Sequence, residues 1–326
     1  MFNFACDPDE SYEANGIVVH NCIYGHGTNE TVMHDGMDDR DKITTPRLTE
    51  ILADLADIGV KAITFSGGGE PMAHPGIREA MWTCVDRGLD FSFITNGSFL
   101  RGDNATLAKR AKWIRVSIDY WDGDSIAKSR GVKPDEFLKI DGNMRGFVDM
   151  KEDCELTINF IVTHENHERL LDVATWLRGV GVDNVRFSPV WMDNFHEYHE
   201  PIRKYVEEQL AWATRLQTDK FKVYSSYRID PNAKLRGYDK CWFQQVVPVI
   251  GADECVYACH NTAYSDKGRV GSIKGRKFSD LWFSDEAKAW FDKFNAREQC
   301  NGIQCAAESK NVLYNEIVNS GTDNFV

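Results

Sequence analysis

The stretch Val60-Lys61-Ala62-Ile63-Thr64-Phe65-Ser66-Gly67-Gly68-Gly69-Glu70-Pro71 decides the fold of this 326-residue chain. Its first half is rich in apolar and β-branched residues, which predicts a buried strand over residues 60–65. Three consecutive glycines follow, and without a Cβ their backbone N–H groups are open to close approach by another molecule. The Glu70 carboxylate adds a negative charge that can hold an ammonium group. The same run also fits a plain strand-to-helix turn.

Strands and helices alternate on both sides of this stretch. Upstream, Thr45-Pro46 predicts the start of a helix, with Thr45 as the N-cap and Pro46 at the first position. Further strands are predicted at residues 91–95, 113–119, 155–163 and 184–188, and helices near 75–87, 104–112, 168–178 and 201–216. This alternation indicates a parallel sheet, and repeated right-handed units of this kind close into a barrel or partial barrel.

Polar residues and glycines gather where the predicted strands end. They are Gly67 to Glu70, Asn96-Gly97, Ser117 with Asp119, and His164 to Asn166. In a barrel of parallel strands the chemistry takes place at the carboxyl ends of the strands. We therefore expect these residues to line one site.

This succession of strand ends resembles the radical S-adenosylmethionine (radical SAM) superfamily over about residues 22–195. In that family the Gly-Gly-Glu run contacts the methionyl amino group of SAM, and the later serine and aspartate lie near its ribose. The resemblance implies these SAM-binding residues: Gly67, Gly68, Gly69, Glu70, Asn96, Ser117 and Asp119. It also implies a [4Fe-4S] cluster whose fourth iron takes the amino and carboxyl groups of SAM.

The start of the chain, Asn15-Gly16-Ile17-Val18-Val19-His20-Asn21-Cys22, indicates a different chemistry. Asn15-Gly16 predicts a turn that leads into an Ile-Val-Val strand. An Asn carboxamide can attack its own backbone carbonyl and cleave the chain. Asn21 is placed to do so, with His20 as proton donor and the Cys22 thiol as acyl acceptor. Residues 1–21 resemble the C-terminal blocks of an intein, which implies protein splicing and a partner that carries the N-terminal intein and extein fragment. A hairpin without chemistry is the alternative.

Cys22 also bears on the predicted cluster. The family binds its [4Fe-4S] cluster through three cysteines spaced C-x3-C-x2-C, and near the glycine run this chain has Cys22 alone. We interpret Cys22 as the third cysteine, joined by splicing to a piece that carries the first two. If Cys22 is instead the second cysteine, Gly25 replaces the third and the chain is a defective radical SAM homologue. On the splicing interpretation the first barrel strand is missing too, which leaves a sheet edge unpaired.

Five of the nine cysteines lie between residues 241 and 305. Their pattern resembles the SPASM or shorter twitch extension of radical SAM enzymes, which implies an auxiliary [4Fe-4S] cluster. The implied metal ligands are Cys241, Cys259, Cys300 and Cys305, with Cys255 as an alternative. Four thiolates also suit a structural zinc ion. A zinc- or cluster-stabilised binding module without catalysis is therefore the alternative function.

Composition narrows the choice of protein class. The formal net charge is -12 without a basic block, which argues against a general nucleic-acid binder. No apolar run reaches the ~18 residues of a membrane span, and no signal peptide is recognisable. The uneven, odd set of cysteines indicates a reducing compartment, so we expect a cytoplasmic protein. Cys84 and Cys154 are expected to be ordinary buried residues.

Together these features predict an α/β protein, a partial (β/α)6-type TIM-like barrel without its first strand, followed by a small cysteine-rich α+β domain. The expected boundaries are 1–21 for the intein fragment, 22–235 for the barrel and 236–326 for the cysteine-rich domain. The implied enzyme, after splicing, cleaves SAM to a 5′-deoxyadenosyl radical and takes a hydrogen atom from a peptide or small molecule. An electron donor such as a flavodoxin or ferredoxin is a further implied partner. Candidate substrate contacts follow the strand at 184–188: Trp191, Met192, Asp193, His196, Tyr198 and His199.

Overall fold

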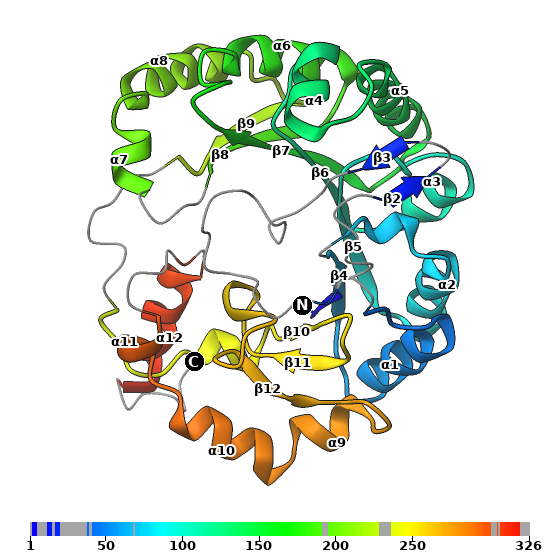
Figure 1. Ribbon diagram of the computed structural model, residues 1–326, viewed down its shortest axis with the longest axis vertical. Coiled ribbons are helices and arrows are strands. Elements are labelled where there is room, and N and C mark those ends of the chain that lie inside the picture. Colours follow the sequence, from blue (N-terminus) through cyan, green and yellow to red (C-terminus); the bar gives the residue numbers. More distant parts are fainter. Residues whose placement is uncertain are drawn as a thin grey trace.

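The computed structural model describes residues 38, 41–67, 69–190, 195–227, 236–300, 305 and 307–319, together with the backbone of residues 2–4, 12–14 and 17–19. Its centre is a ten-stranded sheet in the order β12-β11-β10-β1-β4-β5-β6-β7-β8-β9. Figure 1 shows the sheet curving through the molecule, with helices along its outer side.

Six strands in sequence order pair in parallel from the middle of the sheet to one edge. They are β4 (Ala62–Phe65), β5 (Asp90–Thr95), β6 (Trp113–Ile118), β7 (Glu155–Val162), β8 (Asn184–Pro189) and β9 (Lys222–Ser225). The strand predictions at residues 60–65, 91–95, 113–119, 155–163 and 184–188 are thus confirmed to within two residues at each end. The sequence analysis missed β9, a four-residue strand with one buried side chain.

Helices connect these strands along the outer side of the sheet (Figure 1). They are α1 (Thr45–Asp57), α2 (Ile77–Arg87), α3 (Gly102–Ala108), α4 (Gly123–Arg130), α5 (Asp135–Met150), α6 (Leu170–Val180), α7 (Phe195–His199) and α8 (Arg203–Thr214). The first helix corrects a detail, because its N-cap is Thr44 and not Thr45. Thr44 has the extended backbone of a cap, and its side chain accepts a hydrogen bond from the Arg47 backbone N–H.

Strand β1 (Phe2–Phe4) corrects the expectation that the first strand is missing. It pairs in parallel with β4 on one side and with β10 (Val249–Ile250) on the other. The edge of β4 is therefore occupied, and by residues from the intein-like segment. An open strand edge offers a row of unpaired backbone groups that an extended segment can satisfy, which is the physical reason for this pairing.

The remainder of the described N-terminal segment forms a separate two-stranded sheet. Strands β2 (Tyr12–Ala14) and β3 (Ile17–Val19) pair antiparallel, with Ala14 opposite Ile17. This confirms the strand predicted at Ile17-Val18-Val19. Residues 20–37 lie outside the described part of the chain.

Buried and partly exposed side chains alternate along β6 and β7, and this alternation distinguishes the two faces of the parallel sheet. The side chains that pack against the helices are fully buried: Ile114, Val116, Ile118, Leu156, Ile158, Phe160 and Val162. The alternate positions, Arg115 and Ser117 on β6 and Thr157 and Asn159 on β7, project from the opposite, inner face. The inner face of β6 and β7 is therefore polar.

The C-terminal part continues the sheet and then adds helices. Its strands after β10 are β11 (Cys255–Tyr257) and β12 (Arg269–Ser272), both antiparallel to their neighbours. Its helices are α9 (Phe278–Trp282), α10 (Asp285–Lys293), α11 (Ala296–Gln299) and α12 (Glu308–Asn319). Short 3-10 helices lie at η1 (Pro71–Ala73), η2 (Trp242–Gln245) and η3 (His260–Thr262).

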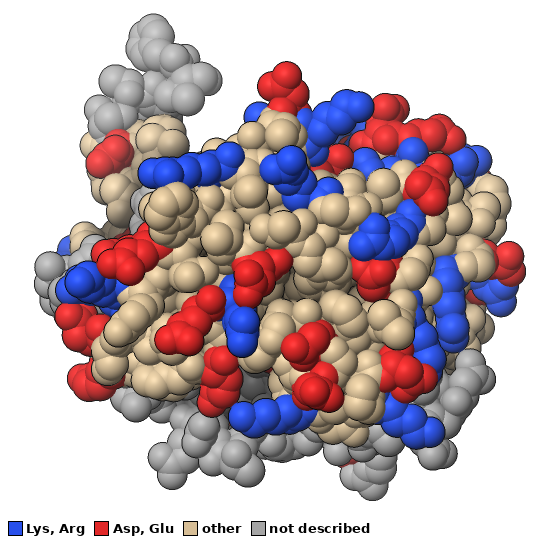
Figure 2. All heavy atoms as spheres, turned by 90° about the horizontal axis from the view of Figure 1, so that it is seen from above, with Lys and Arg blue, Asp and Glu red and all other residues tan. Residues whose placement is uncertain are grey.

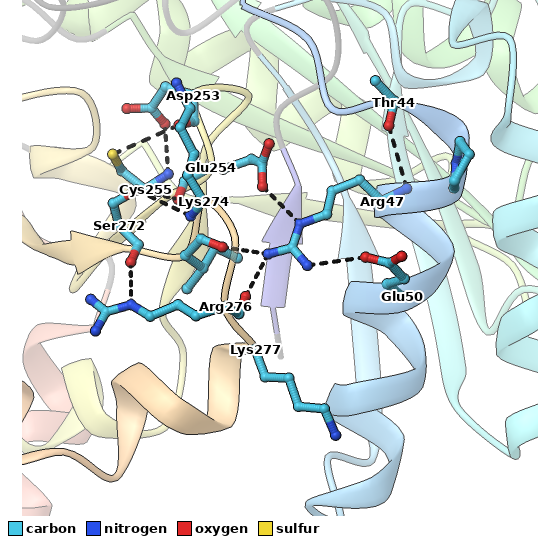
Figure 3. Close-up of polar contacts among 12 residues, drawn as sticks. Thr44, Arg47, Glu50, Asp253, Glu254, Cys255, Ser272, Lys274, Arg276 and Lys277 are labelled. Atoms are coloured by element: carbon cyan, nitrogen blue, oxygen red, sulfur yellow. Dashed lines mark hydrogen bonds and ion pairs between the residues drawn. The ribbon is translucent and has the colours of Figure 1, made fainter.

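Helix α1 holds the C-terminal part through two charged side chains. Figure 3 shows Arg47 pointing from α1 to Glu254 and Arg276, where Nε donates to Glu254 Oε2 at 2.7 Å and Nη2 to the Arg276 carbonyl at 2.7 Å. Two turns later Asp54 accepts from the Ser279 N–H and hydroxyl at 2.9 and 2.8 Å. These contacts fix β11, β12 and α9 against the first strand–helix unit.

The surface carries both signs of charge. On the face seen in Figure 2, acidic and basic side chains are interspersed, without a large basic patch. Among the described residues, no helix is long and apolar enough to cross a membrane.

Candidate active site

Glu70 is the centre of a buried polar network at the end of β4. Its side chain is fully buried, and Oε1 accepts from the Thr95 hydroxyl at 2.6 Å and from the Met72 N–H at 3.0 Å. Oε2 accepts from the Asn96 N–H at 2.7 Å. The carboxylate thus caps η1 and ties the end of β4 to the end of β5.

The electrostatics of Glu70 follow from this burial. Burial raises the pKa of Glu70 to about 7, while the hydrogen bonds from Thr95, Asn96 and Met72 pull it down. Both oxygens are occupied by the chain itself, so the carboxylate links the turn after β4, which contains Gly69, to the turn after β5, which contains Asn96. Its assignment to the methionyl amino group stays a prediction.

Asn96 offers the clearest free donor of the site. Its Oδ1 accepts from the Ser98 N–H at 2.9 Å, but its buried Nδ2 has no hydrogen-bond partner within the described part of the chain. The buried Ser98 hydroxyl is also without a partner there. Asn143 on α5 fixes this turn, because its Nδ2 donates to the carbonyls of Gly97 and Ser98 at 2.9 and 3.0 Å. Buried unpaired polar groups are costly, which marks this turn as a place where a polar ligand fits.

The next strand end holds Ser117 and Asp119. Ser117 is half-buried on the inner face, opposite Asn159 of β7. Asp119 forms an ion pair with Arg130 at 3.1 Å, with both side chains about one-fifth exposed. Its backbone carbonyl accepts from Asn166 Nδ2 at 2.9 Å. Asn166 is buried and also donates to the Ile161 carbonyl at 2.8 Å, so it links the ends of β6 and β7.

A histidine and tyrosine cluster follows β8. The His199 ring is fully buried, and its Nε2 lies 2.9 Å from the Val190 carbonyl, which can only accept. Nε2 therefore carries the proton, and in the neutral ring Nδ1 accepts from the Tyr227 hydroxyl at 3.0 Å. Burial lowers the pKa of His199, which keeps the ring neutral. His196 Nε2 is buried and has no hydrogen-bond partner within the described residues.

Tyr198 completes this cluster of predicted substrate contacts. Its ring packs against His164 and His199, with centroids 4.1 and 5.0 Å apart, and its hydroxyl accepts from the His164 N–H at 3.0 Å. The structure thus brings His196, Tyr198 and His199 together at the carboxyl end of β8. Trp191, Met192 and Asp193 lie outside the described residues.

The four late cysteines influence one another electrostatically. Burial, with a smaller contribution from the neighbouring thiols of Cys300 and Cys305, raises the pKa of Cys241 to about 11 and of Cys259 to about 12. Cys255 instead lies buried in β11 beside Asp253, whose carbonyl accepts from its thiol at 3.8 Å. Among the described residues, no group of three or more His, Cys, Asp or Glu side chains has the arrangement of a metal site. The donor set suits a cluster or zinc.

Four of the predicted site residues lie outside the described part of the chain: His20, Asn21, Cys22 and Gly68. Gly67 and Gly69 are buried at the end of β4. Cys84 and Cys154 are free and buried, as predicted.

The sequence analysis missed Thr95, Asn143 and Tyr227. Thr95 stands immediately before Asn96-Gly97 at a strand end, and that position was the available signal. The other two act through contacts between elements distant in sequence, for which the sequence offers no local pattern.

This chain is similar to known proteins in sequence and in fold. No family model matches the chain. The sequence is 23% identical to the PqqA peptide cyclase of Gluconobacter oxydans over 250 residues, which cover 74% of this chain and 68% of the cyclase. It is 22% identical to the tungsten-containing aldehyde ferredoxin oxidoreductase cofactor-modifying protein of Pyrococcus furiosus over 262 residues, 71% of this chain and 69% of that protein.

The fold is similar to that of SuiB from Streptococcus suis. The structure of SuiB bound to S-adenosylmethionine matches with a TM-score of 0.59 at 13% identity, covering 87% of this chain and 65% of SuiB. The structure bound to the precursor peptide SuiA matches with a TM-score of 0.62, covering 93% and 71%. This chain thus spans about two thirds of the length of these relatives. The similarities support the enzyme class predicted from the sequence, a radical SAM enzyme.

Proposed function

We propose that this chain is the main part of a radical SAM enzyme that modifies a peptide. The observation that carries the proposal is the network in which Glu70 joins the glycine turn after β4 to Asn96 after β5 and leaves the buried Asn96 amide donor unpaired within the described part of the chain. Similarity to a peptide cyclase and to the fold of a peptide-bound enzyme supports a peptide substrate.

In this proposal the chain's own residues bind and orient SAM. Backbone groups of Gly67, Gly68 and Gly69 approach its methionyl end, where a Cβ would stand in the way. Asn96 Nδ2 donates to a SAM oxygen, and Ser117 faces the ribose from β6. When bound and reduced, the cluster and SAM supply a 5′-deoxyadenosyl radical that takes a hydrogen atom from the substrate. The protein positions both reactants and excludes competing reactions.

The finer architecture belongs to the same proposal. The curved parallel sheet serves as a partial (β/α)6 barrel over residues 22–235, and residues 236–326 form the cysteine-rich domain. Cys241, Cys259, Cys300 and Cys305 bind an auxiliary [4Fe-4S] cluster, for which four thiolates are the required set. Their mutual influence on pKa supports this assignment.

The N-terminal segment has its own proposed role. Asn21, His20 and Cys22 carry out splicing with a partner fragment, and Cys22 becomes the third ligand of the SAM-site cluster. Reduction of this cluster then depends on an electron donor such as a flavodoxin or ferredoxin. Mixing the chain with a candidate N-terminal fragment tests this role, because it should yield a ligated product and release residues 1–21.

Binding of SAM to the chain tests the central proposal without requiring a complete cluster. Equilibrium dialysis with labelled SAM should show saturable binding, and Asn96→Ala should weaken it about tenfold, the cost of one buried hydrogen bond. The matched control is Asn104→Ala, since Asn104 lies on α3 and its side chain donates to the Met72 carbonyl. Absence of SAM binding by a folded chain would contradict the proposal.

A further inference from the structure

The inner face of the sheet carries two arginines that the roles proposed above leave unused. Arg115 lies on β6 and Arg186 on β8. Within the described part of the chain, neither guanidinium forms a hydrogen bond or an ion pair. Arg115 only stacks over the ring of Trp113, two residues earlier on the same face, at 5.0 Å from the ring centroid.

The strand register places the two arginines on one surface. Arg115 pairs across to Thr157 of β7, and Arg186 pairs across to Asn159 of the same strand. Thr157 and Asn159 are two residues apart, so both arginines project from the same face. This is the inner face, because Ile114 and Val116 on either side of Arg115 are buried against the helices.

The two charges influence each other. Burial lowers the pKa of Arg115, and the positive charge of Arg186 lowers it further. Arg115 is half-buried, whereas Arg186 is exposed. A half-buried arginine is normally paired, because an uncompensated charge away from water costs free energy. Like charges held together without a partner do not serve stability. Arrangements of this kind occur where a protein trades stability for binding.

The surrounding side chains are polar and already satisfied. Ser188 Oγ lies 2.8 Å from both Asn159 Oδ1 and Ser226 Oγ. The carboxylate of Asp119, just after β6, pairs with Arg130, and that of Glu155, exposed on β7, accepts from Asn184. Neither carboxylate forms an ion pair with Arg115 or Arg186 in the described part of the chain, so both guanidinium groups can receive an anion from a ligand.

We propose that Arg115 and Arg186 bind the carboxylate of an Asp or Glu side chain of the peptide substrate. Arginine is suited to this role because its planar fork matches a carboxylate in bidentate geometry. Arg186 lies in the same row across the sheet as Ser117, at the predicted SAM site. The pair thus anchors an acidic residue next to the position of the radical. The peptide nature of the ligand rests on the function proposed above; the carboxylate site itself does not.

Binding of two matched probes tests the site. N-acetylglutamate amide should bind the chain saturably and change tryptophan fluorescence, because Trp113 stacks on Arg115. The uncharged N-acetylglutamine amide should bind about tenfold more weakly or not at all. Arg115→Gln and Arg186→Gln should each weaken the acidic probe about tenfold, and added salt should weaken it further in the wild-type chain.

Two control variants separate binding between the two arginines from binding elsewhere on the chain. Arg110→Gln is the matched control, since Arg110 also stacks on a tryptophan, Trp82, at 5.4 Å, but outside the sheet. It should leave probe binding unchanged. Trp113→Phe should remove the fluorescence change while dialysis still detects binding.

The outcomes also separate this proposal from the proposed function. Equal binding of both probes, or arginine variants that bind as the wild type does, would overturn the carboxylate site. If the variants lose SAM and not the acidic probe, the anion is the carboxylate of SAM and the proposal is also wrong. If the wild-type chain binds the acidic probe but not SAM, the result contradicts the proposed function and still supports the carboxylate site.

Discussion

Arg47 at the junction of α1 with the C-terminal part and Arg115 on the inner face of the sheet are both largely shielded from water, yet they differ in every contact. Arg47, with its side chain 17% exposed, reaches Glu50, Glu254 and two backbone carbonyls. Arg115 has a tryptophan ring and a second arginine as neighbours. The difference separates polar groups that stabilise the fold from polar groups kept available for a ligand.

Glu70 belongs with Arg47 on the stabilising side, and its removal should have the largest effect. Glu70→Ala leaves three buried donors unpaired, from Met72, Thr95 and Asn96. We expect a loss of about 4 kcal/mol in the free energy of unfolding, measured by urea denaturation. Glu79→Ala, at an exposed position in the first turn of α2, should change it by less than ~0.5 kcal/mol. Equal losses in the two variants would show that the network does not hold the turn.

The same carboxyl should make stability depend on pH. The folded pKa of about 7 exceeds the ordinary value of 4.5, so the folded chain holds a proton that the unfolded chain releases. The stabilisation is fully present below pH 4.5 and is lost as pH rises through about 7, a change of roughly 3 kcal/mol. The free energy of unfolding of the wild type minus that of Glu70→Gln, followed from about pH 4.5 to about 8, should decrease by this amount. A difference that stays flat, or increases with pH, would show that Glu70 is ionised in the folded chain.

Arg47 should come next in size. Arg47→Gln keeps part of the length but loses the charge-assisted bonds to Glu254 and to the carbonyls of Ile273 and Arg276. We expect a loss of about 2 kcal/mol in urea denaturation, with β11 and β12 exchanging their amide hydrogens faster. Arg78→Gln is the control, because its ion pair with Asp103 is half-exposed and should contribute less than ~1 kcal/mol. If the two variants are equally stable, α1 does not hold the C-terminal part in place.

The sequence predicted the repeating part of the fold well, because strand and helix periodicity is local. Val60 to Phe65 and the later apolar runs reveal the parallel strands, and the residues at their ends reveal one edge of the sheet. The place of Phe2–Phe4 between β4 and β10 could not be predicted. It depends on a vacant edge contributed by residues far away in the sequence, Ile63 to Phe65 on one side and Val249-Ile250 on the other.

For the candidate site, the sequence identified residue types but not what each one contacts. Glu70 looked like a free charge for an ammonium group, and only the structure shows three donors from η1 and the end of β5 around it. The sequence analysis did not select Arg115 and Arg186, because an arginine in a strand of alternating apolar and polar residues is usually a solvent-facing side chain. Their importance depends on the register of β6, β7 and β8 and on the absence of a partner among the described residues, which no local pattern encodes.

The smallest expected change in the free energy of unfolding is that of Arg115→Gln, and its sign is opposite to that of Arg47→Gln. It is the sharpest test of the difference between the two arginines. Arg115→Gln removes a half-buried charge that faces Arg186 and has no ion pair or hydrogen bond in the described part of the chain. The free energy of unfolding should stay unchanged or rise by up to about 0.5 kcal/mol, whereas Arg47→Gln lowers it. The change should be greatest at low ionic strength, where repulsion between the two guanidinium groups is least screened. A loss of stability comparable to that of Arg47→Gln would mean that Arg115 supports the fold, and the distinction between the two arginines would fail.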